Sequence, residues 1–592
     1  MAERIVSPGV FTREVDQSFL PAGVAAIGAA VIGPTAKGPA GIPTIVTSYS
    51  DFVQKFGGTF TSGSGATQAS YKYLTNYMAQ EYLKYADTLT VVRILAGAYG
   101  PASAAVTASG VADNAFSLYT LSDGADQNSS GSEGSNNTLT AGTVNNLRWE
   151  VSNVSNSKGT FTLLIRRGDD TSKRKIILEQ YNNLTLDPNS NNYIAKVIGD
   201  QVYTMKDSGT TDPFLQLSGS YANRSNLIRV EVNRTTYNYL DANGNIRDNA
   251  LSASLPAAIS GTFAGGSDGT VVHPKQFNDE ITNTNTQGFN LGVAGSGKTA
   301  YEDAIYLLKN QDEYDINLLC LPGLIDNFAN HSTILTTALT AMEDRADAFL
   351  LIDPVEYGAT IGTAVSKAES RDTNYAATYW PWVKIPDADL GRNVWVPAST
   401  LIPSVYAFND RVAAPWYAPA GLNRGALDIA VQTERKLTQS NRDTLYESAV
   451  NPIATFPNAG VVVYGQKTLQ KKASALDRVN VRRLLIAAKK FVASATKFLV
   501  FENNTAATRN RFLSIVNPYF ESVQQRQGLY AFRVIMDDSN NTPDVIYFQL
   551  LVFSLLVNLK STNVNSVERI PKLSVYTLNL KGFTNIPTNK FK

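Results

Sequence analysis

The residues best suited to chemistry in this sequence are Gly292-Val-Ala-Gly-Ser-Gly297-Lys298-Thr299, which match the pattern G-x-x-x-x-G-K-[ST] in full. In a phosphate-binding loop of this kind, backbone N–H groups and the lysine hold the phosphates of a nucleotide, and the threonine hydroxyl holds Mg²⁺. Asp353 ends the apolar run FLLID and resembles the acid that completes such a site. Taken alone, Gly292, Gly297, Lys298, Thr299 and Asp353 suggest a P-loop ATPase or nucleotidase.

The residues before this motif argue against a nucleotide site. A phosphate-binding loop follows a buried strand, because the sheet edge places the loop at the start of a helix. The preceding residues, NDEITNTNTQGFN, are polar instead. Thr299 and Glu302 have the spacing of a capping box for a helix over AYEDAIYLLKN, and the glycines give the chain room to enter it. We therefore favour a flexible linker into a capped helix and keep nucleotide binding as the alternative.

The other chemistry-bearing residues are too few for a second candidate site. The sequence holds one cysteine, Cys320, in the apolar run INLLCLPG, and two histidines, His273 and His331. One cysteine excludes an intramolecular disulfide, and two histidines without a cysteine cluster do not predict a metal site. A serine or cysteine nucleophile would have no obvious histidine base. We predict no catalytic residue, no cofactor and no metal.

The composition describes an ordinary globular protein of several domains. A chain of 592 residues exceeds one hydrophobic core, and 52 Lys+Arg against 51 Asp+Glu leave almost no net charge. A general nucleic-acid binder would show a basic excess, so that class is disfavoured. The first residues lack the apolar core of a signal peptide, and no apolar run approaches the ~20 residues of a membrane span. We expect no cleaved export signal and no membrane insertion.

Changes in composition indicate an α/β protein interrupted by a polar, β-rich segment. Apolar strands alternate with helices on both sides of that segment, which is typical of a sheet covered on both faces. Its own short alternating runs predict antiparallel strands that project to solvent. The fold class is multidomain α/β (α+β) with a mixed, largely parallel sheet. The predicted units are an N-terminal arm, 1–20; the first half of a middle domain, 21–99; the insertion, 100–269; the second half, 270–439; and a C-terminal domain with a terminal arm, 440–592.

The stretch from Val461 to Phe501 combines a short buried strand with a long amphipathic helix. From Val481 to Ala495 apolar residues recur at spacings of three and four, which predicts one buried face. At ~100° per residue, five cations gather on another side. They are Arg478, Arg482, Arg483, Lys489 and Lys490. This side is either solvated or paired with acids of its own domain, or it docks an acidic partner.

Several runs resemble the contractile tail sheath proteins of bacteriophages and related injection machines. SPGVFTREVD and VIGPTAKGPAGIPTIVTSYSDFVQKFGG are similar to the N-terminal signature of that family, and residues 370–427 to its central region. YGQKTLQKKASALDRVNVRRLLIAAKK and LVFENNTAATRNRF are similar to its C-terminal domain. The resemblance covers residues 5–99 and about 270–546. Residues 547–592 depart from the family pattern, which leaves open whether they form a linking arm.

The resemblance implies a structural subunit and not an enzyme. Such subunits form hexameric rings that stack helically around a tail tube, and contraction drives the tube through the host envelope during genome delivery. The implied partners are further copies of the chain, the tail tube protein, and the baseplate and tail-terminator proteins, in a virion assembled in the host cytoplasm. In this picture the N-terminal arm joins the C-terminal domain. Its residues Val10, Phe11, Thr12, Arg13 and Val15 would pair as a strand between subunits, and the five cations would touch the tube.

A different function for the β-rich insertion stays open. A non-contractile assembly or adhesion protein could use residues 100–269 as a receptor-binding domain. Binding of the isolated insertion to cells would favour that hypothesis.

Overall fold

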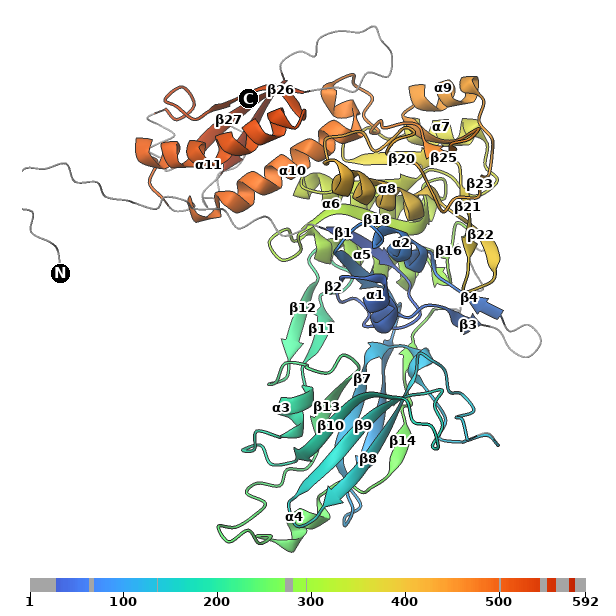
Figure 1. Cartoon of the computed structure of the whole chain (residues 1–592), viewed down its shortest axis with the longest axis vertical. Helices are drawn as coiled ribbons and strands as arrows, with labels where there is room; N and C mark the ends of the chain where they lie inside the picture. The colour runs from blue at the N-terminus through green and yellow to red at the C-terminus, as the bar shows by residue number, and fades with distance from the viewer. Residues whose placement is uncertain are drawn as a thin grey trace, which may run out of the picture.

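The computed structural model describes residues 28–62, 69–135, 137–271, 281–293, 295–499, 502–542, 551–559 and 574–580. The predicted arm, with Val10, Phe11, Thr12, Arg13 and Val15, lies outside the described residues. The molecule is long: a β-rich unit forms one end, a central body follows, and a C-terminal unit of helices and strands lies beside the other end (Figure 1). Within the described residues, no helix is both long and apolar enough to cross a bilayer.

An eight-stranded mixed sheet forms the centre of the body, in the order β2-β5-β1-β18-β19-β20-β24-β25. The six inner strands run parallel, and the two edge strands, β2 and β25, are antiparallel to their neighbours. The strands are β1 (Gly28–Gly33), β2 (Thr44–Val46), β5 (Leu89–Arg93), β18 (Ile316–Ile325), β19 (Phe349–Asp353), β20 (Ala376–Trp380), β24 (Val450–Phe456) and β25 (Gly460–Val463). The prediction of a mixed, largely parallel sheet is confirmed.

Helices cover both faces of this sheet because successive strand residues enter different hydrophobic clusters. Val31 and Cys320 belong to one cluster, whereas Ile32 and Leu321 belong to the other. Both sets are fully or almost fully buried, so the strands read as continuous apolar runs. The helices of the first cluster are α1 (Tyr49–Phe56), α2 (Leu74–Tyr82), α8 (Ala398–Val412) and one side of α10 (Val479–Ala495); those of the second are α5 (Ser296–Lys309), α6 (Ala329–Arg345), α7 (Ile361–Glu369) and α9 (Gln439–Glu447).

The sheet continues further along the chain than predicted. β24 pairs in parallel with β20, and β25 returns antiparallel to β24. Ile453 and Val463 lie in the same core as the first strands of the sheet. The boundary predicted between residues 439 and 440 is therefore wrong, because the body reaches at least Val463. The error arose because Val461–Tyr464 precedes the long helix in sequence, although its strand pairs with the body.

The segment between β5 and β18 forms a separate antiparallel unit, which we call the insertion. Two four-stranded sheets, β10-β9-β8-β14 and β13-β7-β6-β15, enclose one core. A hairpin, β11 with β12, reaches back toward the body, where Ser208 and Gly209 donate hydrogen bonds to Asp303 of α5 at 2.6 and 2.8 Å. The elements are β6 (Tyr99–Thr107), β7 (Asn114–Asp123), β8 (Leu147–Ser155), β9 (Thr160–Arg167), β10 (Ile177–Thr185), α3 (Ile194–Ile198), β11 (Val202–Lys206), β12 (Phe214–Ser218), β13 (Ile228–Val232), α4 (Asn249–Ala253), β14 (Ser260–Thr262) and β15 (Ser267–Asp268).

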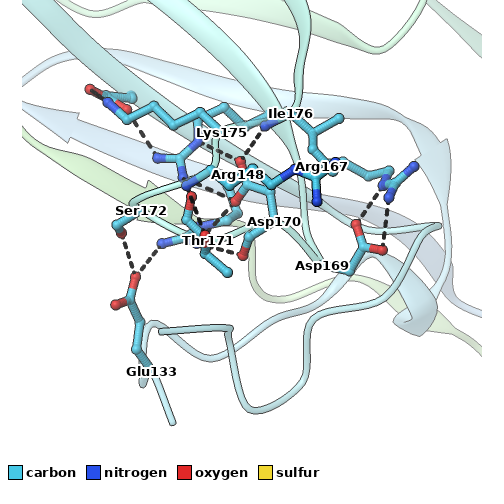
Figure 2. Close-up of polar contacts among 12 residues, drawn as sticks. Glu133, Arg148, Arg167, Asp169, Asp170, Thr171, Ser172, Lys175 and Ile176 are labelled. Atoms are coloured by element: carbon cyan, nitrogen blue, oxygen red, sulfur yellow. Dashed lines mark hydrogen bonds and ion pairs between the residues drawn. The ribbon is translucent and has the colours of Figure 1, made fainter. Parts of the chain in front are cut away.

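A buried ion network joins two strands of the insertion (Figure 2). Arg148 of β8 and Arg166 of β9 are directly opposite in the ladder, where two like charges would repel. The carboxylate of Asp170, with no exposed side-chain surface, lies between them at 3.1 Å from Arg148 and 2.8 Å from Arg166. Each arginine also holds an outer carboxylate, Glu133 for Arg148 and Glu150 for Arg166. The network compensates the opposed charges and fixes the loop that follows β9.

The C-terminal unit packs two helices against a three-stranded antiparallel sheet of order β26-β27-β28. Apolar residues of both helices, among them Leu484 and Phe512, share one core with Leu529. The elements are α10 (Val479–Ala495), α11 (Ala506–Gln525), β26 (Leu529–Ile535), β27 (Leu551–Leu559) and β28 (Ser574–Leu580). Residues Leu551–Leu559 and the run SVYTLNL thus form strands.

Short strands complete the fold around the body. They are β3 (Phe60–Ser62) with β4 (Ala69–Tyr71), β16 (Asn285–Thr286) with β17 (Phe289–Asn290), and β21 (Val383–Asp387) with β22 (Arg392–Val396) and β23 (Gln432–Thr433).

Candidate functional site

The segment that matches the phosphate-binding pattern enters α5 from a short turn and not from a buried strand. The strand before it, β17, is two residues long and pairs with β16. A Cβ atom at Gly295 or Gly297 would lie 2.4 or 2.7 Å from the carbonyl oxygen of Asn290. Both glycines are therefore explained by the close packing of the helix start on this turn, without a bound phosphate.

The start of α5 also differs from the predicted capping box. The helix begins at Ser296 with Gly295 as its N-cap, so Thr299 lies inside the helix and cannot cap it. The prediction is wrong because the close-packed glycines let the helix start before Thr299. The ammonium of Lys298 lies 3.7 Å from the carboxylate of Glu302, one turn further along. Lys298 thus has a partner within its own helix.

Asp353 is buried at the end of β19, and its carboxylate is engaged inside the body. It accepts hydrogen bonds from the backbone N–H of Ser399 at 2.9 Å and from the Ser399 hydroxyl at 2.5 Å. Ser399 lies in the first turn of α8, so Asp353 compensates the unpaired N–H groups of that helix start. Burial raises the pKa of the Asp353 carboxyl to about 7. No group of His, Cys, Asp and Glu within the described residues could hold a metal ion.

We expect the Asp353→Asn variant to lose a pH dependence of stability between about pH 4 and pH 7. The folded-state pKa of Asp353 is about 7 and the ordinary value is 3.8, so the folded protein binds a proton that the unfolded chain releases in this range. This group therefore makes the wild type more stable at pH 5 than at pH 8. Urea unfolding at both pH values measures the difference for each protein.

The comparison between the two proteins is the control for other titrating groups. Burial lowers the pKa of His331 to about 4, which acts in the opposite direction, because the folded state loses stability as pH falls below 6.5. His331 is unchanged in the variant. Equal pH profiles for wild type and Asp353→Asn would contradict the expectation.

The cations of α10 do not form the exposed strip expected from the helical spacing. Arg482 is 4% exposed and Lys490 8%, and the Arg483 side chain is 10% exposed. The expectation is wrong for these residues because α10 lies between the core of its own unit and the body (Figure 1). A helix with two packed sides buries cations if the second side supplies partners.

Each of the five cations contacts another part of the chain. The contacts are Arg483 with Asp410 at 2.5 Å, Lys490 with Asp347 at 3.2 Å and with Asp315, Arg482 over the ring of Tyr375 at 3.6 Å, Lys489 with the carbonyl oxygen of Ala346 at 3.2 Å, and Arg478 with the hydroxyl of Tyr446 at 2.5 Å. Four of these cations lie within α10 and contact residues of the body, so we call Arg482, Arg483, Lys489 and Lys490 the α10 clamp. The predicted tube contact of these cations stays a prediction, but its premise of an exposed strip does not hold.

The C-terminal sheet offers an edge that sequence reasoning missed. Among the described strands, β26 pairs with β27 alone, and Tyr530 on it is 57% exposed. An open edge of this kind can accept a strand from another chain. The sequence predicted the donor arm but not an acceptor, because the pattern LYAFRVI does not distinguish an edge strand from a central one.

Two models of protein families match the body and the C-terminal unit. The phage tail sheath protein central domain matches residues 294–469, and the phage tail sheath C-terminal domain matches residues 471–571. The body and the C-terminal unit are therefore similar to the central and C-terminal domains of phage tail sheath proteins. The central-domain match extends beyond β25, in agreement with the sheet, and the C-terminal match begins before α10.

Individual sheath proteins show the same relationship. The tail sheath protein of Vibrio phage KVP40 is 38% identical over 213 residues, which are 36% of this chain and 31% of that protein. The tail sheath protein of Salmonella phage ViI is 29% identical over 290 residues, 46% of this chain and 45% of that protein. The matched parts thus span less than half of these relatives. The crystal structure of a sheath tail protein from Listeria innocua, 11% identical, superposes with a TM-score of 0.54 over 94% of this chain and 96% of the other, which shows a shared fold.

Proposed function

We propose that this chain is the structural subunit of a contractile tail sheath. It polymerises as stacked hexameric rings around a tail tube and contracts to drive the tube through the host envelope during genome delivery. The observation that carries this proposal is the pair of adjacent family matches, to the central and C-terminal domains of tail sheath proteins. Its partners are further copies of the chain, the tail tube protein, and baseplate and tail-terminator proteins. It is a virion component assembled in the host cytoplasm, and it uses no cofactor.

The contact between copies that fits this chain is strand addition at the C-terminal sheet. The β26 edge would accept residues 10–15 of a neighbouring copy, and backbone hydrogen bonds would join the two. A repeated contact whose rotation does not close gives a helical polymer. Because paired strands move as one body, they can persist while side-chain interfaces shift between an extended and a contracted packing.

We expect the purified chain to form hollow, striated sleeves in electron micrographs, alone or with its tube protein. Phe11→Pro should abolish them, because proline removes a backbone donor and disfavours strand pairing. Phe11→Ala is the matched control, since it shortens the same side chain but keeps the N–H group. Circular dichroism of both variants checks that the monomer is folded.

Two results would contradict different parts of the proposal, namely the sheath function and the strand addition. Concentrated protein that stays monomeric both alone and beside its tube would contradict the sheath function itself. Normal sleeves from Phe11→Pro would contradict strand addition by residues 10–15 and leave the sheath function standing. A nucleotidase is not proposed as a second function, because Lys298 and Asp353 each have partners inside the chain.

A further inference from the structure

A cleft of about 660 Å³ separates the body from α10. Its walls are aromatic and aliphatic, with Tyr82 from α2, Tyr406 from α8, and Ile486 and Ala487 from α10. The volume lies within the range of sites that hold a small ligand or a few side chains. The cleft lies beside the α10 clamp, since Arg483 and Lys490 also line it.

Two polar atoms of residues that line this cleft have no hydrogen-bond partner among the described residues. The guanidinium of Arg483 gives one nitrogen, Nη2, to Asp410, but its buried Nη1 is unpaired. The buried Oδ1 of Asp410 is unpaired as well. Both atoms have almost no accessible surface, so they lie beneath the wall and do not face the cleft. The exposed Arg411 adds a second cation to the same wall.

The described chain begins at the wall of this cleft. A Cβ atom on Gly28 would lie 2.3 Å from the carbonyl oxygen of Thr88, and Thr88 lines the cleft. Gly28 also pairs with Ile316 of β18, and the adjoining Asn317 and Leu318 form another part of the wall. The residues that precede Gly28 therefore start next to the cleft.

We propose that residues 16–27 of the same chain, DQSFLPAGVAAI, occupy this cleft. Phe19 and Leu20 supply the apolar side chains that the tyrosine-lined walls would cover, and Asp16 supplies a carboxylate for the exposed guanidinium of Arg411. Twelve extended residues reach roughly 40 Å, so each of these side chains can lie in a cleft that opens beside Gly28. Residues 16–27 thus match the cleft in three respects: they carry apolar side chains, they carry a carboxylate, and they begin beside its wall.

Docking of residues 16–27 in the cleft is independent of the proposed function. Its consequence for assembly rests on that function. With residues 16–27 held in the cleft, only residues 1–15 can extend away from the subunit. Fully extended, they span roughly 50 Å. The cleft would then set where the strand-forming arm departs and how far it extends. It would also place the start of the arm beside the α10 clamp. The arm would then leave the subunit at the place where the C-terminal unit contacts the body.

Hydrogen exchange of the full-length monomer tests the docking. We expect the amides of residues 16–27 to exchange at least about tenfold more slowly than in a peptide of the same sequence. Ala487→Trp fills the cleft and should remove this protection. Ala493→Trp, on an exposed position of the same helix, is the matched control and should leave it. Protection that is absent in the wild type, or insensitive to Ala487→Trp, would overturn the proposal.

A cross-link gives a second measurement that does not depend on a large substitution. Ala487→Cys is combined in turn with a cysteine at each position from 18 to 24, and the native Cys320 is fully buried and cannot compete. We expect at least one pair to form a disulfide within the monomer, with Ala493→Cys as the control. Disulfides only between chains would show that the cleft receives another copy and would overturn docking within one chain. An equal yield with the control would overturn it too. Sleeve assembly does not depend on whether this disulfide forms. The cross-linking result and the assembly result can therefore fail independently.

Discussion

Replacing Asp170 by alanine is expected to lower the free energy of unfolding of the insertion by about 3–5 kcal/mol. The side chain is fully buried and lies between Arg148 and Arg166, at 3.1 and 2.8 Å. It also accepts a hydrogen bond from the backbone N–H of Ile176 at 3.0 Å. Its removal leaves two buried guanidinium groups facing each other and one N–H without its acceptor. Because each arginine keeps an outer carboxylate, we expect the lower end of the range.

The neighbouring residue provides the control. Asp169 pairs with Arg167 at 2.5 Å, but the two side chains are 28% and 35% exposed. Exposed pairs contribute only ~0–1 kcal/mol, so Asp169→Ala should change stability little. Hydrogen exchange of the amides of β9, a central buried strand of the insertion, measures both variants. At ~1.4 kcal/mol per factor of ten, Asp170→Ala should accelerate exchange by roughly two to three and a half orders of magnitude. Equal effects of the two variants would contradict this account.

The body could be predicted from sequence because its signals are local. Ser48 caps α1 by accepting a hydrogen bond from the N–H of Asp51 at 3.1 Å, and Gly57 ends the helix with a φ of 78°. Both residue types are the ones that such positions favour. The strands of the sheet are buried on both faces, so their apolar runs are unbroken. At these positions the preference of each residue type therefore agrees with the place it takes in the fold.

The ion partners could not be predicted, because they depend on register and on packing between units. Arg148 and Arg166 become neighbours only when β8 and β9 pair in the observed register. The partners of the α10 clamp lie in the body, 73 residues away in sequence for Arg483 and Asp410. A helical pattern identifies an apolar face but does not distinguish a solvated polar face from one that packs on another unit. The motif at Gly292–Thr299 misleads for the same reason, since its meaning depends on the strand before it.

Changing Arg482 to glutamate is expected to release α10 from the body in the isolated monomer. Arg482 is 4% exposed, and its guanidinium lies 3.6 Å from the centre of the Tyr375 ring. A glutamate there would bury a carboxylate against the ring face, which carries negative charge density. A buried carboxylate without a compensating partner costs about 3–5 kcal/mol, which opposes the packing of α10 on the body. Hydrogen exchange of the α10 amides in the monomer measures the release.

The tube-contact hypothesis gives the opposite expectation for the same variant. If Arg482 served to touch an acidic tube, Arg482→Glu would leave the monomer within about 0.5 kcal/mol of the wild type, as surface substitutions do, and only growth of sleeves on tubes would fail. Lys497→Glu, at an exposed cation just after α10, is the matched control and should preserve exchange in both cases. Because both hypotheses predict the loss of sleeves, assembly cannot separate them, but the exchange of the monomer can. Unaltered α10 protection in Arg482→Glu together with failed assembly would show that this arginine acts between proteins and not inside one.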